Sequence, residues 1–125
     1  MDRKNYYTID SYLKHQYVSP LWAKDLSNLP QLLIQCGSVE MLYDEIVAFS
    51  KHYMRDNQVN KITCEVYRGH VHVFHVLFWI SPGARVALDR SGKWIQQVTG
   101  RLGGRVKDTG LIDITHNGQV RKVYK

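Results

Sequence analysis

The residues best suited to chemistry are a carboxylate and a group of histidines, which follow two separate apolar runs. Glu40 comes after the run QLLIQC, residues 31–36, and Asp44 lies four positions further along. The second run, ITCEVY, residues 62–67, is followed by three histidines, His70, His72 and His75. A carboxylate that holds the Nδ1–H of an imidazole leaves Nε2 free to take a proton from a nucleophile. The order of acid and then histidine therefore predicts the orienting half of a catalytic triad.

The elements that must position these residues alternate between strand and helix. The two apolar runs read as buried strands, since each is short and bounded by turn or loop residues. Two amphipathic patterns read as helices, at residues 41–55 and from Ser81-Pro82 to about Val98. In that second pattern Ser81 is the expected N-cap and Pro82 the first helical residue. This order predicts an α/β fold with a parallel sheet, and two strands are too few to complete one.

The helical faces and the strand ends give more detail. In the first helix the apolar face is Leu42, Ile46, Phe49 and Tyr53. In the second it contains Ala84, Leu88, Ser91, Ile95 and Val98. Functional groups of open α/β sheets gather in loops at the carboxyl ends of strands, which here are residues 37–40 and 68–75. Asp44 is the alternative acid, although a carboxylate there also suits the first turn of a helix.

A longer match supports the triad interpretation. The run SPLWAKDLSNLPQLLIQCGSVEMLYDE, residues 19–45, closely resembles the hormone-sensitive-lipase-like carboxylesterases, the fold-3 branch of the α/β-hydrolases, and especially their fungal members. In that family the motif G-x-x-[DE]-x-L-x-D-E carries the triad acid, which corresponds here to Glu40. The segment Glu65–Phe74 is similar to the family's last strand and H-x-F loop, which makes His72 the triad histidine. The resemblance implies hydrolysis of small-molecule carboxylic esters, with no cofactor and no metal.

The chain departs from the family in what it lacks. Neither the nucleophile motif G-x-S-x-G nor an HGGG-type oxyanion loop occurs in the sequence. Both lie upstream of the matching region in the family, so we expect the carboxyl-terminal portion of a hydrolase, inactive by itself. The family commonly has Asp at the position of Glu40. The alternative is a truncated, non-catalytic remnant or gene-model fragment, which would self-associate through an exposed sheet edge.

Composition and charge divide the chain into three segments. Residues 1–18 are a polar N-terminal segment, residues 19–99 carry the hydrolase resemblance, and residues 100–125 form a basic, glycine-containing tail. The net charge is +6, and six Lys or Arg residues lie from Gly100 onward. This tail could contact nucleic acid or membrane, but it lacks any known nucleic-acid motif, which favours a disordered extension or a small hairpin. No signal peptide or apolar span is visible, so the default localisation is cytoplasmic.

The remaining candidates have structural interpretations. His70, His72 and His75 could form a metal site, but no carboxylate or thiolate joins them with ligand spacing. We expect His70 and His75 to face solvent in the loop. Trp22, Phe74 and Trp79 are expected in the core or in a pocket wall. Cys36 and Cys64 each lie in a strand-like run, which indicates free, buried thiols.

Overall fold

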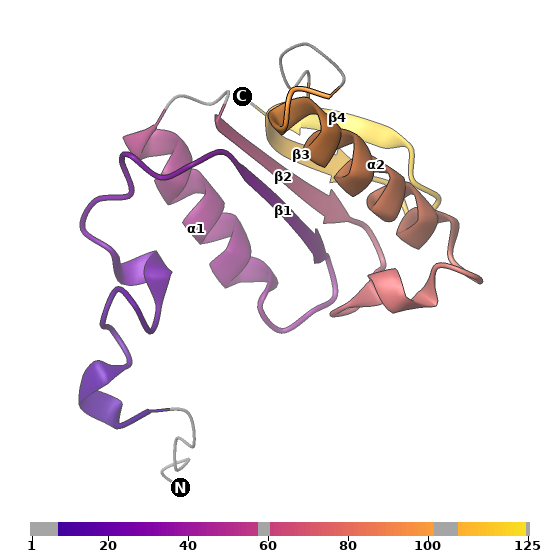
Figure 1. Cartoon of the computed structure of the whole chain (residues 1–125). Helices are drawn as coiled ribbons and strands as arrows, with labels where there is room; N and C mark the ends of the chain where they lie inside the picture. Colours follow the sequence, from indigo (N-terminus) through magenta and orange to yellow (C-terminus); the bar gives the residue numbers. More distant parts are fainter. Residues whose placement is uncertain (1–7, 58–60, 102–107, 125) are drawn as a thin grey trace, which may run out of the picture.

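A computed structural model describes residues 8–57, 61–101 and 108–124 (Figure 1). Two 3₁₀ turns, η1 (Asp10–Tyr12) and η2 (Pro20–Trp22), lead into strand β1 (Leu32–Gly37). The chain continues through helix α1 (Tyr43–Asp56), strand β2 (Ile62–Tyr67) and a 3₁₀ turn, η4 (Phe74–Leu77). Helix α2 (Pro82–Val98) and strands β3 (Gly110–Ile114) and β4 (Val120–Tyr124) complete it. The strand–helix–strand–helix order predicted from the sequence is present.

The four strands form one sheet in the order β1-β2-β3-β4. Strands β1, β2 and β3 are parallel, and β4 runs antiparallel to β3. Ile34 pairs with Cys64 in the first ladder, and Tyr67 pairs with Ile114 in the second. The protein therefore has a mostly parallel α/β sheet with β1 and β4 at its edges, as expected from the sequence for a portion of an α/β-hydrolase fold.

The two helices cover opposite faces of this sheet. Tyr53 of α1 shares a core with Ile62 of β2, whereas Ala84 of α2 shares another with Tyr67. Because side chains alternate between faces along a strand, residues 62 and 67 point in opposite directions. The connection through α1 leads from β1 to its neighbour β2, and the connection through α2 leads from β2 to its neighbour β3, so both move in the same direction across the sheet. Because α1 and α2 lie on opposite faces, the two connections have opposite handedness. One of them is therefore left-handed, which is rare for a parallel crossover.

Local residues explain most element boundaries. Ser81 caps α2, since its Oγ accepts a hydrogen bond from the Ala84 amide, and Pro82 begins the helix. Helix α1 begins at Tyr43, two residues later than the apolar pattern predicted, and has no side-chain cap. Leu42 at its N-cap lies 47% exposed. Of the described helices, none is both long and apolar enough to cross a membrane.

The tail differs from an isolated hairpin. The pattern around Asn117-Gly118 is present as β3 and β4, with the Gly118 amide donating to Thr115 O at 2.9 Å. Strand β3 pairs with β2 as well, and Ile112 and Ile114 are fully buried. Sequence alone did not predict this third parallel partner of the sheet. Residues 102–107 of the tail lie outside the described residues.

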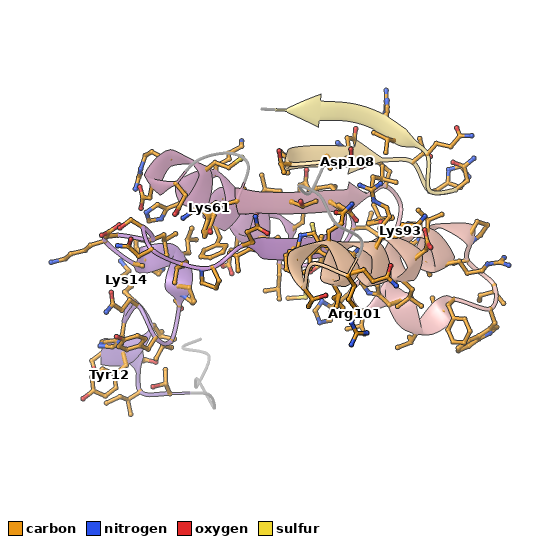
Figure 2. The ribbon with its side chains drawn as sticks, turned by 45° about the horizontal axis from the view of Figure 1, so that its top comes forward. Tyr12, Lys14, Lys61, Lys93, Arg101 and Asp108 are labelled. Carbon is orange, nitrogen blue, oxygen red and sulfur yellow. The ribbon has the colours of Figure 1, made fainter. Side chains whose placement is uncertain are left out.

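Three expected core aromatics have different environments. Phe74 is 1% exposed and packs in the core with Tyr67. Trp22 is 54% exposed and Trp79 is 62% exposed, so neither lies in the core, and a place in a pocket wall stays a prediction for both. The ammonium group of Lys14 lies over the Trp22 ring, and Figure 2 shows Lys14 on the far side of the molecule from Lys93.

Candidate functional site

Hydrogen bonds join the two loops at the carboxyl ends of β1 and β2. The amides of Ser38 and Val39 donate to the carbonyl oxygens of Tyr67 at 3.0 Å and His70 at 3.1 Å. In return, the Gly69 amide donates to Ser38 Oγ at 2.9 Å. The neighbouring strands are parallel and in register, so the loop with the acid and the loop with the histidines leave the sheet side by side.

Glu40 and His72 meet at this junction. His72 Nδ1 lies 3.3 Å from Glu40 Oε1, and Glu40 Oε2 accepts a hydrogen bond from the Gly37 amide at 2.9 Å. The Glu40 side chain is 3% exposed, whereas that of His72 is 66% exposed. A carboxylate has no donor, so Nδ1–H donates when the imidazole is neutral, and Nε2 then carries the free lone pair. The carboxylate is thus fixed and buried while the imidazole reaches into solvent.

Asp44, the alternative acid, lies elsewhere. It is exposed in the first turn of α1, where negative charge is favourable near the helix N-terminus. The structure brings Glu40 to His72 and leaves Asp44 on the helix surface. Nothing in the described part of the chain pairs Asp44 with a histidine.

Comparison with known proteins identifies the family of the chain. The family model Abhydrolase_3, described as alpha/beta hydrolase fold, matches residues 2–76, more than half of the chain. This chain belongs to the α/β-hydrolase fold-3 family. An acetyl-hydrolase of Streptomyces hygroscopicus is 32% identical over 87 residues, which cover 70% of this chain and 28% of that relative. The chain therefore spans less than a third of the relative's length. No solved structure gave a significant match.

The other two histidines of this hydrolase chain are not solvent-facing, so that expectation was wrong. His70 is 9% exposed, and its ring lies between Ser81 Oγ and the carbonyl of Arg68, both at 3.0 Å. His75 is partly buried, and its Nε2 lies 2.8 Å from Gln35 Oε1. Burial lowers the pKa of His75 and so favours its neutral form. The loop is therefore held by the two histidines that flank His72.

This geometry also separates the three histidines. Each imidazole has a different partner: Ser81 for His70, Glu40 for His72 and Gln35 for His75. Among residues 8–57, 61–101 and 108–124, no three His, Cys, Asp or Glu side chains come together as metal ligands would. The described histidines therefore do not form the metal site considered as an alternative from their spacing.

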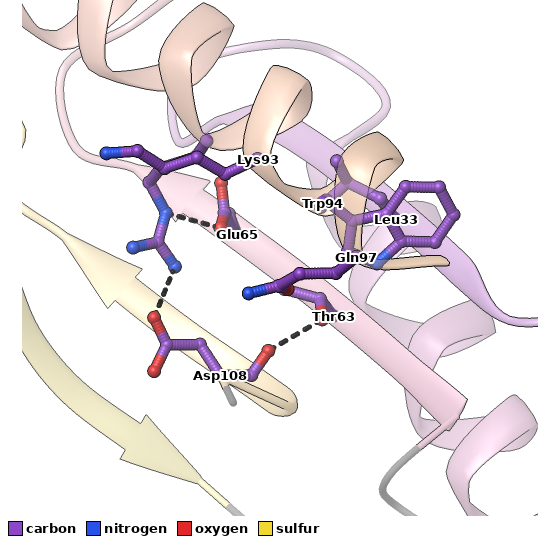
Figure 3. A pocket seen from close by; sticks show the side chains of 8 residues that line it. Leu33, Thr63, Glu65, Lys93, Trp94, Gln97 and Asp108 are labelled. Carbon is purple, nitrogen blue, oxygen red and sulfur yellow. Dashed lines mark hydrogen bonds and ion pairs between the residues drawn. The ribbon is translucent and has the colours of Figure 1, made fainter. Parts of the chain in front are cut away.

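A buried polar network beneath α2 was not predicted from the sequence. Glu65 Oε1 accepts from Arg90 Nε at 2.6 Å, and Glu65 Oε2 accepts from Gln35 and Tyr67 at 2.8 and 2.9 Å. Figure 3 shows the bond between Glu65 and the guanidinium, and Asp108 bridging from the guanidinium to Thr63. A cavity of about 180 Å³ adjoins the network. The only sequence signal was a charged residue inside an apolar strand.

Charge and burial explain the protonation states here. Burial and the neighbouring carboxylate of Glu65 raise the pKa of Tyr67, which keeps its hydroxyl protonated as a donor. Burial alone would lower the pKa of Arg90, but attraction to Glu65 outweighs it and raises that pKa. On the other face of the sheet, Cys36 and Cys64 are buried free thiols, as predicted. A hydrogen bond with Cys64, together with burial, raises the pKa of Cys36.

Proposed function

We propose that this chain carries the acid–histidine half of a carboxylic-ester hydrolase, with Glu40 as the acid and His72 as the base. The observation that carries the proposal is that the two oxygens of the Glu40 carboxylate face two different donors. One oxygen accepts from the Gly37 amide and the other lies 3.3 Å from His72 Nδ1. An acid held by the backbone and turned toward Nδ1 is the arrangement that orients a catalytic imidazole.

In this mechanism the exposed Nε2 of His72 takes the proton of a serine hydroxyl as that oxygen attacks the ester carbonyl. His72 then returns the proton to the departing alcohol, which leaves an acyl-enzyme. In the second half it deprotonates water, and the acid product leaves as the serine is regenerated. Glu40 keeps the imidazole in the Nδ1–H tautomer and stabilises the imidazolium. The exposure of His72, at 66% of its side chain, leaves room for a nucleophile and substrate.

The serine in this proposal belongs to a part of the hydrolase domain that this sequence does not contain, and it docks beside β1. Strand β1 is an edge strand, and parallel strands are normally covered on both sides. A largely apolar cavity of about 540 Å³ adjoins this edge, lined by residues that include Leu29, Leu32, Ile34 and Phe49. A further strand and helix of a hydrolase domain would bury these side chains. We propose that the nucleophile-bearing part of the domain packs there.

The substrate class follows from the same proposal. The Streptomyces relative is named an acetyl-hydrolase, which favours an ester with a short acyl group. The polar atoms of the half-site are one carboxylate and one imidazole, which together serve proton transfer and require no metal or organic cofactor.

A chimera tests the assignment. In it, the matching segment of the Streptomyces acetyl-hydrolase is replaced by this chain, and hydrolysis of p-nitrophenyl acetate is followed. We expect activity in the chimera and a loss on the order of 10³–10⁴ in kcat for Glu40→Gln or His72→Ala. Asp44→Asn is the matched control and should leave kcat unchanged. Full activity of the Glu40→Gln chimera, or a loss of activity in Asp44→Asn alone, would contradict the assignment.

The chain alone tests the other half of the proposal. Because no G-x-S-x-G occurs in the sequence, we expect no labelling by a fluorophosphonate probe. The active chimera, treated in parallel, should label at its serine. Stoichiometric labelling of the 125-residue chain would show that the nucleophile lies within it.

A further inference from the structure

The loop that carries His72 is held at one end by a directed chain of hydrogen bonds. Nδ1 of His70 lies 3.0 Å from the carbonyl oxygen of Arg68, which can only accept, so Nδ1 carries the proton. Nε2 of the neutral ring is then an acceptor, and Ser81 Oγ lies 3.0 Å away to donate. Ser81 Oγ accepts in turn from the Ala84 amide at 3.2 Å. The tautomer of His70 is thereby fixed, and the loop is tied to the first turn of α2.

Two glycines allow this placement. An ideal Cβ at Gly37 would lie 2.1 Å from His70 O, and one at Gly83 would lie 2.6 Å from His70 Nε2. His70 therefore fits between the loop of the acid and the N-terminus of α2, with no room for a side chain on either glycine. Its carbonyl also accepts from the Val39 amide, which directly precedes Glu40. One residue thus contacts the acid loop, the histidine loop and the helix.

The two residues that flank His72 are more exposed than His70 and Phe74, the residues beyond them. Phe74 is buried and packs against the His70 ring with centroids 4.6 Å apart. Between these two anchors, Val71 and Val73 are 51% and 50% exposed, and Val73 adopts a left-handed conformation with φ of 53°. His72 is therefore the middle of a three-residue bridge whose direction is set at its ends.

We propose that His70, through its hydrogen bond from Ser81, is a positioning residue that holds His72 in hydrogen-bonding orientation to Glu40. It does not touch the reacting atoms. The proposal rests on the function proposed for Glu40 and His72. His70 and the helix cap Ser81 thus have a role beyond packing. They keep the imidazole of His72 oriented toward Glu40 before any substrate binds.

Nitrogen-15 NMR of the histidine rings in the full chain tests this directly. In the unmodified chain we expect His70 and His72 both as Nδ1–H tautomers, with the Nε2 of His70 accepting a hydrogen bond. Ser81→Gly removes the hydroxyl while retaining most of the capping, and Ser81→Thr retains both. We expect the His72 ring to lose its single tautomer and its Nδ1–H signal in Ser81→Gly and in His70→Asn, and to keep them in Ser81→Thr.

A matched control separates positioning from general stability. Thr99→Ala removes a hydroxyl at the other end of α2, one that donates to Ile95 O at 2.8 Å, and should leave the His72 signals intact. Equal loss in Thr99→Ala, or unchanged His72 signals in folded Ser81→Gly, would overturn the proposal. If Ser81→Gly does not fold, the unmodified chain still decides, since an Nε2–H tautomer of His70 overturns it. An unchanged His72 ring in Glu40→Gln would instead contradict the proposed function.

Discussion

The ring of His70 occupies the space that a side chain at Gly83 would need. A Cβ at Gly83 would lie 2.6 Å from both Cε1 and Nε2 of that ring, and 2.6 Å from the carbonyl oxygen of His116. Gly83 is in the first turn of α2, where a helix would ordinarily gain stability from alanine. At this position, close packing of the helix against the His70 ring therefore takes precedence over helix propensity.

Alanine at two glycines of α2 should have opposite effects. Gly83→Ala is expected to lower the free energy of unfolding by about 1–3 kcal/mol, because the new methyl group displaces a buried ring and a backbone oxygen. Gly92→Ala is the matched control, since nothing lies within 4 Å of a Cβ there. It should raise the free energy of unfolding by about 0.5–1 kcal/mol. Urea denaturation measures both, and equal effects would show that the steric contact is absent.

Removing the guanidinium of Arg90 should uncover a buried charge. The Glu65 side chain is 2% exposed, so Arg90→Leu leaves a carboxylate without its cation and should cost about 3 kcal/mol. Glu65→Gln introduced into that variant should recover much of the loss, because a neutral amide needs no counter-charge. The exposed pair Lys93–Asp89 is the control, and Lys93→Ala should change stability by less than about 1 kcal/mol. Additive losses in the double variant would contradict coupling between Arg90 and Glu65.

Stability should fall on mild acidification because of His75. Burial, with a smaller contribution from repulsion by His70, lowers the pKa of His75 below its ordinary value of 6.5. The unfolded chain then binds more protons than the folded chain between the two pKa values, so stability rises with pH in that window. The contribution is fully present above pH 6.5 and is lost as the pH falls through the folded pKa.

The variant His75→Gln isolates this effect, since its Nε2 can still donate to Gln35 but does not titrate. Thermal denaturation between pH 7 and pH 4.5 should show a shallower loss of Tm in His75→Gln than in the unmodified chain. His15→Gln, in the exposed N-terminal segment, should keep the original slope. Identical pH profiles for the unmodified chain and His75→Gln would rule out a depressed pKa.

Deleting residues 110–125 should promote self-association. In the full chain β3 pairs with β2, and its Ile112 and Ile114 are fully buried. Deletion turns β2 into an edge strand and exposes part of the core around Tyr67, which invites pairing between copies. Sedimentation velocity should show larger species at lower concentration than for the full chain. Met41→Ser is a control, since Met41 is 97% exposed and does not belong to the hairpin. The self-association of this variant should match that of the full chain.

The sequence by itself determined the family and the order of the elements, and it predicted Glu40 and His72 as the two residues of the half-site. These rest on local information: an apolar run of about six residues, a helical period, a Ser-Pro cap, and the motifs around Glu40 and His72. Asn117-Gly118 likewise indicated a hairpin. Each of these signals lies within a short stretch of chain, where backbone preference and side-chain spacing are sufficient to predict the local structure or motif.

Only the tertiary structure decided where the hairpin pairs and what surrounds His72. Strand β3 joins β2 across a connection that contains α2, and no local pattern encodes such a partner. His70 and His75 looked like solvent-facing loop residues because imidazoles are polar, yet each has a buried hydrogen-bond partner, Ser81 and Gln35, from a distant segment. Glu65 is tolerated inside the sheet because Arg90 of α2, 25 residues further along the sequence, neutralises it. A polar group can be buried only where folding supplies hydrogen-bond partners for it. Whether it is buried or exposed therefore cannot be read from the residue alone.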